Sequence, residues 1–157
     1  MLFRSEKATE LGVSAIVPFF CERTVPKLDR AASAKRGERW RRIALSATKQ
    51  SGRTRAPEIL DLIEFAELAC RPWDCERKII FWEGESARGL NDVREESPRV
   101  DSLLIAIGPE GGFTPDEVAL AARAGFQSAR LGKRILRTET AAVAAMAAAQ
   151  TLWGDLG

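Results

Sequence analysis

The segment SLLIAIGPEGGFTPDE, residues 102–117, decides the fold class of this 157-residue chain. Its first part, Ser102–Ile107, is a short apolar run that predicts a buried β-strand. Gly108–Phe113 predicts a glycine-rich turn. Thr114-Pro115-Asp116-Glu117 then predicts the start of a helix, because Thr114 can cap it, proline suits the first helical position and Glu117 completes a capping box. A buried strand followed directly by a turn and a helix is typical of parallel α/β proteins.

The same alternation extends in both directions along the chain. Further strands are predicted at Val13–Phe20, Lys78–Trp82 and Ser128–Leu131, and helices at Glu6–Leu11, Ala31–Lys49, Leu60–Ala69, Pro115–Ala124 and Thr138–Trp153. We therefore predict an α/β fold, with a parallel sheet covered by helices on both faces. The length matches a single domain that spans residues 1–157.

The composition excludes several classes of protein. With 45% hydrophobic and 29% charged residues, the chain is neither mainly disordered nor fibrous. No apolar run approaches the roughly 20 residues needed to cross a bilayer, and the first residues do not resemble a signal peptide, so we expect a cytoplasmic protein. The absence of histidine excludes Ser-His-Asp and Cys-His catalysis. Cys21, Cys70 and Cys75 match no zinc pattern, so no metal site is predicted.

Positive charge is concentrated in the N-terminal part of the chain. Residues 1–56 hold 13 Lys and Arg against 5 Asp and Glu, whereas residues 57–157 hold 11 against 17. The basic run is densest between Lys35 and Arg55, contains Trp40 and leads into the polar segment Gln50–Arg53. Such a run favours contact with a polyanion such as a nucleic acid, and the Trp40 indole could either stack on a base or pack in the core. The alternative is an ordinary solvated helix surface.

Three segments follow predicted strands: Trp82–Gly84, Ile107–Gly112 and Leu131–Thr140. Ligands of parallel sheets bind beyond the carboxyl ends of the strands, so the convergence of these segments predicts a small-molecule pocket. The glycine loop has neither the P-loop nor the dinucleotide fingerprint, and it suits a flat, uncharged group such as adenine better than a pyrophosphate. Each feature also has a purely structural interpretation. The glycine loop could be a plain tight turn, the segment before the last helix could be a helix cap with an Arg137–Glu139 ion pair, and the alanine-rich last helix could form a core or subunit contact.

Four blocks occur in one order along the chain: Lys7–Val13, Arg39-Trp40 with Gln50–Arg53, Ile107–Gly112, and Leu131–Ala141. Together they resemble the 16S ribosomal RNA (uracil-N3) methyltransferase family of the SPOUT superfamily, over essentially the whole chain. The most specific part is Gly-Pro-Glu-Gly-Gly followed by Leu-Gly-x-Arg-Ile-Leu-Arg-Thr-Glu-Thr-Ala. The resemblance implies a C-terminal trefoil knot, S-adenosylmethionine as the cofactor, a homodimer, and ribosomal RNA of the small subunit as the partner.

The resemblance also implies roles for individual residues. Cofactor-binding residues are expected in three loops: Glu83, Ile107, Gly108, Pro109, Glu110, Gly111, Gly112, Leu131, Gly132, Ile135, Leu136, Arg137, Thr138, Thr140 and Ala141. The expected RNA-binding residues are Arg4, Lys7, Arg39, Trp40, Arg42, Lys49 and Gln50. The catalytic candidates are Arg53, which would stabilise the uracil anion, and Glu139, which would act as the general base. Helix capping or ion pairing is the alternative role for Glu139.

Members of this family usually carry an N-terminal β-barrel that binds RNA, and this chain starts at the catalytic domain, so the barrel is expected to be absent. The alternative function is a non-catalytic RNA-binding or ribosome-assembly module on the same fold. An adenine-nucleotide enzyme of ordinary doubly wound type is less favoured, because the chain has no phosphate-binding signature.

Overall fold

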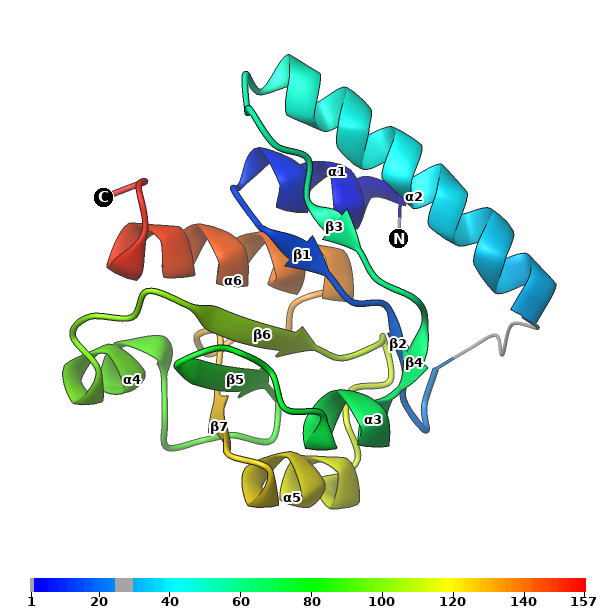
Figure 1. The fold of residues 1–157 in the computed structure, drawn as a ribbon. Coiled ribbons are helices and arrows are strands. Elements are labelled where there is room, and N and C mark those ends of the chain that lie inside the picture. The colour runs from blue at the N-terminus through cyan, green and yellow to red at the C-terminus, as the bar shows by residue number, and fades with distance from the viewer. Residues whose placement is uncertain (1, 25–29) are drawn as a thin grey trace.

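The computed structural model describes residues 2–24 and 30–157, with the side chains of 5–24 and 35–157 (Figure 1). The elements in chain order are α1 (Leu2–Glu10), β1 (Ala15–Ile16), β2 (Phe19–Phe20), α2 (Arg30–Gln50), β3 (Glu58–Ile59), β4 (Ile63–Glu64), α3 (Phe65–Cys70), β5 (Arg77–Phe81), α4 (Leu90–Glu96), β6 (Leu103–Ile107), α5 (Pro115–Arg123), β7 (Phe126–Ala129) and α6 (Thr138–Trp153). Within the described part of the chain, no helix combines the length and apolar character that a membrane span requires.

All strand pairs are parallel, as predicted, but the strands lie in three small sheets. β1 pairs with β3, β2 pairs with β4, and β5 lies between β6 and β7 in the largest sheet. The predicted strand Val13–Phe20 is divided into β1 and β2 around Pro18. A proline has no N–H to donate to a ladder, which accounts for this interruption.

Side chains of β5 alternate between two hydrophobic cores. Ile80 is 1% exposed and lies in the core with Phe113 and with residues of α3 and α5. Ile79 is fully buried in the second core, with Val93 of α4 and Ala145 of α6. Successive strand residues point to opposite faces, so helices cover both faces of this sheet, as predicted.

One predicted helix is partly wrong, and one helix was not predicted. The predicted helix Leu60–Ala69 is partly a strand: Ile63–Glu64 forms β4, and the helix begins only at Phe65. The parallel pairing of Ile63 with Phe19 accounts for the difference, because a ladder with a distant strand overrides the local apolar spacing. The helix α4 was not predicted; its signal is a Leu90–Val93 spacing, and Asp92 Oδ2 accepts a 2.6 Å hydrogen bond from the backbone N–H of Gly89.

The capping box at the start of α5 is confirmed. The Thr114 hydroxyl accepts a hydrogen bond from the Glu117 N–H at 3.3 Å, and Glu117 Oε2 accepts one from the Thr114 N–H at 2.9 Å. These bonds satisfy backbone donors that have no partner inside the helix. The helix therefore begins directly after the glycine-rich turn and fixes where that turn ends.

Arg53 fastens the end of α1 to the segment that follows α2. Its Nη1 donates to the carbonyls of Thr9 at 2.8 Å and Val13 at 2.9 Å, and its Nη2 donates to Gly12 at 3.3 Å. Gly12 has a φ of 86°, the left-handed conformation that ends a helix. Carbonyl groups at a helix C-terminus lack helical partners and carry partial negative charge, which the guanidinium balances.

Arg53→Ala should lower the free energy of unfolding by about 1–2 kcal/mol, because the mutation leaves three carbonyl acceptors without their charged donor. Urea denaturation measures this value. Arg55 is exposed, so Arg55→Ala is the matched control and should change the value by less than about 0.5 kcal/mol. Equal values for the two variants would contradict a structural role for Arg53.

Candidate functional site

Three strand ends lie side by side in the largest sheet. Phe81, the last residue of β5, is opposite Ile107 of β6 on one side and Ala129 of β7 on the other. The Trp82 N–H also donates to the Ala129 carbonyl at 3.1 Å. The segments that follow these strands therefore leave the sheet at one edge, which confirms their predicted convergence.

The glycine loop touches the segment that follows β5. Gly112 has a φ of 69°, and a Cβ at this position would overlap the carboxylate of Glu83. A Cβ at Gly108 would lie 3.2 Å from the ring of Phe113, which is 1% exposed. Gly112 therefore needs glycine for its backbone conformation, and a side chain at Gly108 would crowd the buried ring of Phe113. Two of the three predicted cofactor loops are thus in direct contact.

The third loop, between β7 and α6, is open to solvent. Gly132 has a φ of 76°, with no atom within 4 Å of its ideal Cβ position. Ile135 is 86% exposed. Over the described residues, no backbone N–H of 132–136 donates to a carbonyl of another residue. At the ends of this loop, Leu131 packs against the core that contains Ala145, and Thr138 is buried.

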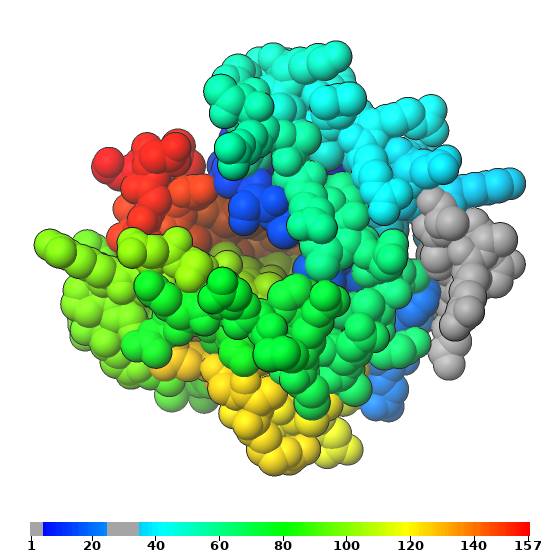
Figure 2. Space-filling model, viewed as in Figure 1, coloured from blue at the N-terminus to red at the C-terminus, as the bar shows by residue number. Residues whose placement is uncertain are grey.

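A cavity of about 630 Å³ connects the glycine loop with α6 and the N-terminal strands. Figure 2 shows the molecule hollowed on this face, between the blue N-terminal segment, the orange α6 and the yellow-green β6 region. Ile107–Glu110 line it on one side, Ala142, Met146 and Ala149 on another, and Val13–Phe20 on a third. No residue of Trp82–Gly84 or Leu131–Thr140 is among its lining residues, so this cavity is not the pocket predicted where the three segments converge.

The predicted RNA-binding residues of α2 fall into two groups. Arg39, Arg42, Lys49 and Gln50 are exposed on the helix surface. Trp40 is 5% exposed and packs with Ala44 and Ile59, which favours packing over stacking on a base. The basic surface of this helix is therefore a charged face without an aromatic platform.

Two further RNA-binding predictions lie on α1. The Lys7 ammonium donates to Glu10 at 2.9 Å, and this bond with the carboxylate raises the pKa of Lys7. The Lys7 charge is thus paired within α1, and its contact with an RNA phosphate stays a prediction. The side chain of Arg4 lies outside the described residues.

The two catalytic candidates lie on different elements. Arg53 is bound to the end of α1, as described above. Glu139 is half-buried in the first turn of α6, directly after the third loop. The four ion pairs found among the described residues do not include one between Arg137 and Glu139. Of the two, Glu139 lies within the predicted segment Leu131–Thr140, whereas Arg53 lies outside the three predicted segments.

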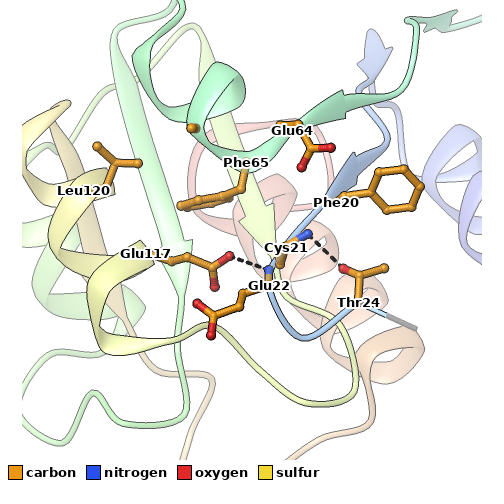
Figure 3. A pocket seen from close by; sticks show the side chains of 9 residues that line it. Phe20, Cys21, Glu22, Thr24, Glu64, Phe65, Glu117 and Leu120 are labelled. Carbon is orange, nitrogen blue, oxygen red and sulfur yellow. Dashed lines mark hydrogen bonds between the residues drawn. The ribbon is translucent and has the colours of Figure 1, made fainter. Parts of the chain in front are cut away.

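A turn that was not predicted as part of the site lies against the glycine loop. It comprises Cys21–Thr24, at the end of β2, and Arg23 Nη1 donates to the Gly111 carbonyl at 2.9 Å. The partners are 88 residues apart in the sequence, so no local pattern could have revealed this contact. Figure 3 shows the neighbouring contacts: the Glu22 N–H donates to Glu117, and the Cys21 N–H donates to the Thr24 hydroxyl.

The same turn lines a second cavity of about 410 Å³, together with Phe65 and Glu117 (Figure 3). Burial raises the pKa of the Cys21 thiol to about 12, so this cysteine is protonated at neutral pH and is a poor nucleophile. All three cysteines are free. Among the described residues, no group of acidic or cysteine side chains is arranged to hold a metal ion.

Comparison with known proteins extends these observations. A family model described as an RNA methyltransferase domain matches residues 3–150. Ribosomal RNA small subunit methyltransferase E of Bacillus subtilis is 39% identical over 147 residues, which cover 91% of this chain and 57% of that protein. The Mesomycoplasma hyopneumoniae protein of the same name is 38% identical over 142 residues, covering 90% of this chain and 60% of that protein.

Solved structures agree with the sequence matches. The methyltransferase E from Neisseria gonorrhoeae, solved with S-adenosylmethionine, has a TM-score of 0.88 and 43% identity, over 100% of this chain and 62% of that one. A putative methyltransferase from Legionella pneumophila, in complex with the same cofactor, has a TM-score of 0.91 and 34% identity. The match covers 99% of this chain and 62% of that one.

The chain thus spans about three fifths of the length of the relatives that it matches. The family model, by contrast, accounts for nearly all of the chain, including the three loops at the edge of the sheet. The chain therefore belongs to the RNA methyltransferase domain family.

Proposed function

We propose that this chain is the catalytic domain of an S-adenosylmethionine-dependent methyltransferase that modifies N3 of a uridine in 16S ribosomal RNA. The observation that carries the proposal is the meeting of the segments after β5, β6 and β7 at one edge of the sheet. The names of the relatives and the cofactor in two similar structures support the same activity.

The loops fit the chemistry of the cofactor. Adenine presents ring nitrogens that accept hydrogen bonds and flat faces that are apolar. The backbone N–H groups of 132–136 have no carbonyl partner within the described chain, and the Ile135 side chain offers exposed apolar surface. Such a loop can bind an adenosyl group with its amides and cover it with an aliphatic side chain. We therefore assign cofactor binding to this loop, the glycine loop and Glu83.

When bound, S-adenosylmethionine supplies an electrophilic methyl group on its sulfonium. The protein must then orient the uracil and help N3 lose its proton. Glu139 is our candidate for the group that accepts this proton, because it follows the third loop directly. Stabilisation of the uracil anion by Arg53 remains a prediction, which would require its guanidinium to leave the three carbonyls that it now binds.

The remaining elements of the proposal concern the fold and its partners. We propose a SPOUT-type trefoil knot that includes the third loop, and a homodimer in the cytoplasm. The half-exposed alanines on α6, such as Ala144 and Ala147, support a subunit contact, because small side chains allow a second helix to approach closely. The exposed Arg39, Arg42 and Lys49 support RNA binding by α2.

Transfer of a labelled methyl group tests the activity itself. The chain incubated with methyl-labelled S-adenosylmethionine and small-subunit RNA or subunits should yield labelled RNA, and nuclease digestion should place the label on N3-methyluridine. Cofactor binding without any transfer would favour the alternative of a non-catalytic RNA-binding module.

Ile135→Ser should weaken S-adenosylmethionine binding about tenfold, because burial of an isoleucine side chain on binding contributes roughly 1.5–3 kcal/mol. Isothermal titration calorimetry measures the change. The melting temperature should stay the same, since the side chain is 86% exposed in the free protein.

Leu156→Ser is the matched control, because Leu156 is also exposed, at 55%, but lies at the C-terminus beyond α6. Its affinity for the cofactor should equal that of the wild type. If Ile135→Ser also binds as the wild type does, the third loop does not cover the ligand.

Neutralising the basic face of α2 should reduce the salt dependence of RNA binding. Each neutralised phosphate contributes about −0.7 to −0.9 to the slope of log K against log salt. The triple variant Arg39→Gln, Arg42→Gln, Lys49→Gln should therefore reduce the slope by about 2. Fluorescence anisotropy with a labelled RNA fragment, over a range of salt concentrations, gives this value.

Arg94, Arg99 and Arg123 are exposed arginines elsewhere on the molecule. Their triple glutamine variant carries the same change in net charge and should keep the wild-type slope. Identical slopes for both triple variants would show that total charge, and not the face of α2, governs RNA binding.

A further inference from the structure

The turn Cys21–Thr24 is attached to the glycine loop and to α5 by two separate contacts. Arg23 Nη1 donates to the Gly111 carbonyl at 2.9 Å, and the Glu22 N–H donates to Glu117 Oε1 at 2.9 Å. Glu117 Oε2 accepts the Thr114 N–H in the capping box. Both ends of the segment from Gly111 to Glu117 are thus fixed by one turn of the N-terminal region. Figure 3 shows the contact at the Glu117 end.

The turn itself has internal hydrogen bonds. The Cys21 N–H donates to the Thr24 hydroxyl at 2.8 Å, and the Thr24 N–H donates to the Cys21 carbonyl at 3.0 Å. Cys21 is 7% exposed and belongs to the core that contains Phe113. The backbone that carries Arg23 is therefore held in place before any ligand arrives.

The absence of a side chain at Gly111 permits this close contact. A Cβ at Gly111 would lie 3.0 Å from Cβ of Arg23 and 3.5 Å from its carbonyl oxygen. Gly111 is exposed at the surface, and its carbonyl is held there by the hydrogen bond from Arg23. Without the guanidinium, the peptide group after Gly111 would lose its charged donor and could rotate more freely.

We infer that Arg23 is a positioning residue of the cofactor loop: its guanidinium fixes the Gly111 carbonyl and so holds the glycine loop in the shape that binds S-adenosylmethionine. The inference rests on the proposed function for the identity of the ligand. Its physical basis is preorganisation, since a loop ordered before binding loses less conformational freedom when the ligand arrives.

Three variants test whether Arg23 positions the glycine loop. Arg23→Met keeps an unbranched side-chain stem but removes the guanidinium with its donors, and Arg23→Lys keeps a charged donor group. Arg123→Met is the matched control, because Arg123 is an exposed arginine at the end of α5 that makes no hydrogen bond within the described residues.

Amide hydrogen exchange in the free protein, followed by NMR, tests the positioning role without any ligand. The informative amides are Gly112, which donates to the Pro109 carbonyl, and Thr114, which donates to Glu117. Their exchange should be about 3- to 10-fold faster in Arg23→Met. Arg23→Lys should restore much of the protection, and Arg123→Met should match the wild type.

Calorimetric titration with S-adenosylmethionine is the second measurement. Arg23→Met should bind about 3- to 10-fold more weakly at an unchanged melting temperature, with partial recovery in Arg23→Lys. In turnover assays the KM for the cofactor should rise while kcat at saturating cofactor and RNA stays within about twofold of the wild type, as expected for loss of uniform binding.

The outcomes distinguish this inference from the proposed function. If the wild-type protein does not bind the cofactor, the proposed function fails, and the exchange rates of Gly112 and Thr114 still decide whether Arg23 orders the loop. Unchanged exchange in Arg23→Met would overturn the inference. The inference would also be overturned if Arg23→Met bound the cofactor as tightly as the wild type but bound RNA more weakly, because Arg23 would then be an RNA contact.

Discussion

Parallel pairing of β5 with a strand on each side is the interaction on which the rest of this structure depends. The registers place Phe81, Ile107 and Ala129 in one row, so three carboxyl ends coincide. The pairing is stable because the central strand is buried on both faces: Ile79 and Ile80 are 0% and 1% exposed. Each such side chain contributes roughly 1.5–3 kcal/mol on burial. Loops distant in the sequence are thereby brought to one edge.

The N-terminal half is attached to α6 and to the glycine loop by side-chain contacts with backbone carbonyls. Within this half, Arg53 binds the carbonyls at the end of α1, and Gln150 of α6 donates to the Leu11 carbonyl at 2.8 Å. Arg23 makes a corresponding contact with Gly111 at the opposite end of β1 and β2. The basic helix α2 and the loops at the edge of the largest sheet therefore belong to one connected structure.

The predictions that succeeded rest on local chemistry. The Thr114–Glu117 capping box, the helix Thr138–Trp153 and the strand Leu103–Ile107 are each determined by residues within a few positions of one another. The prediction of a helix at Leu60–Ala69 is wrong before Phe65, because Ile63 and Glu64 pair with β2. Trp40 shows the same limit, since its position in a basic run could not reveal that it packs against Ile59 of β3.

The sequence by itself determines the α/β class, the segments that follow the strands and the uneven distribution of charge. All three depend only on residue type and on the order of residues over a short range. The tertiary structure decided which of these groups meet. It placed Glu83 over Gly112, bound Arg53 to α1, and brought Arg23 to the Gly111 carbonyl. The partners are 29 positions apart for Glu83 and Gly112, 44 for Arg53 and Thr9, and 88 for Arg23 and Gly111. No local sequence pattern encodes which distant backbone a side chain contacts, because that depends on how the strands pair.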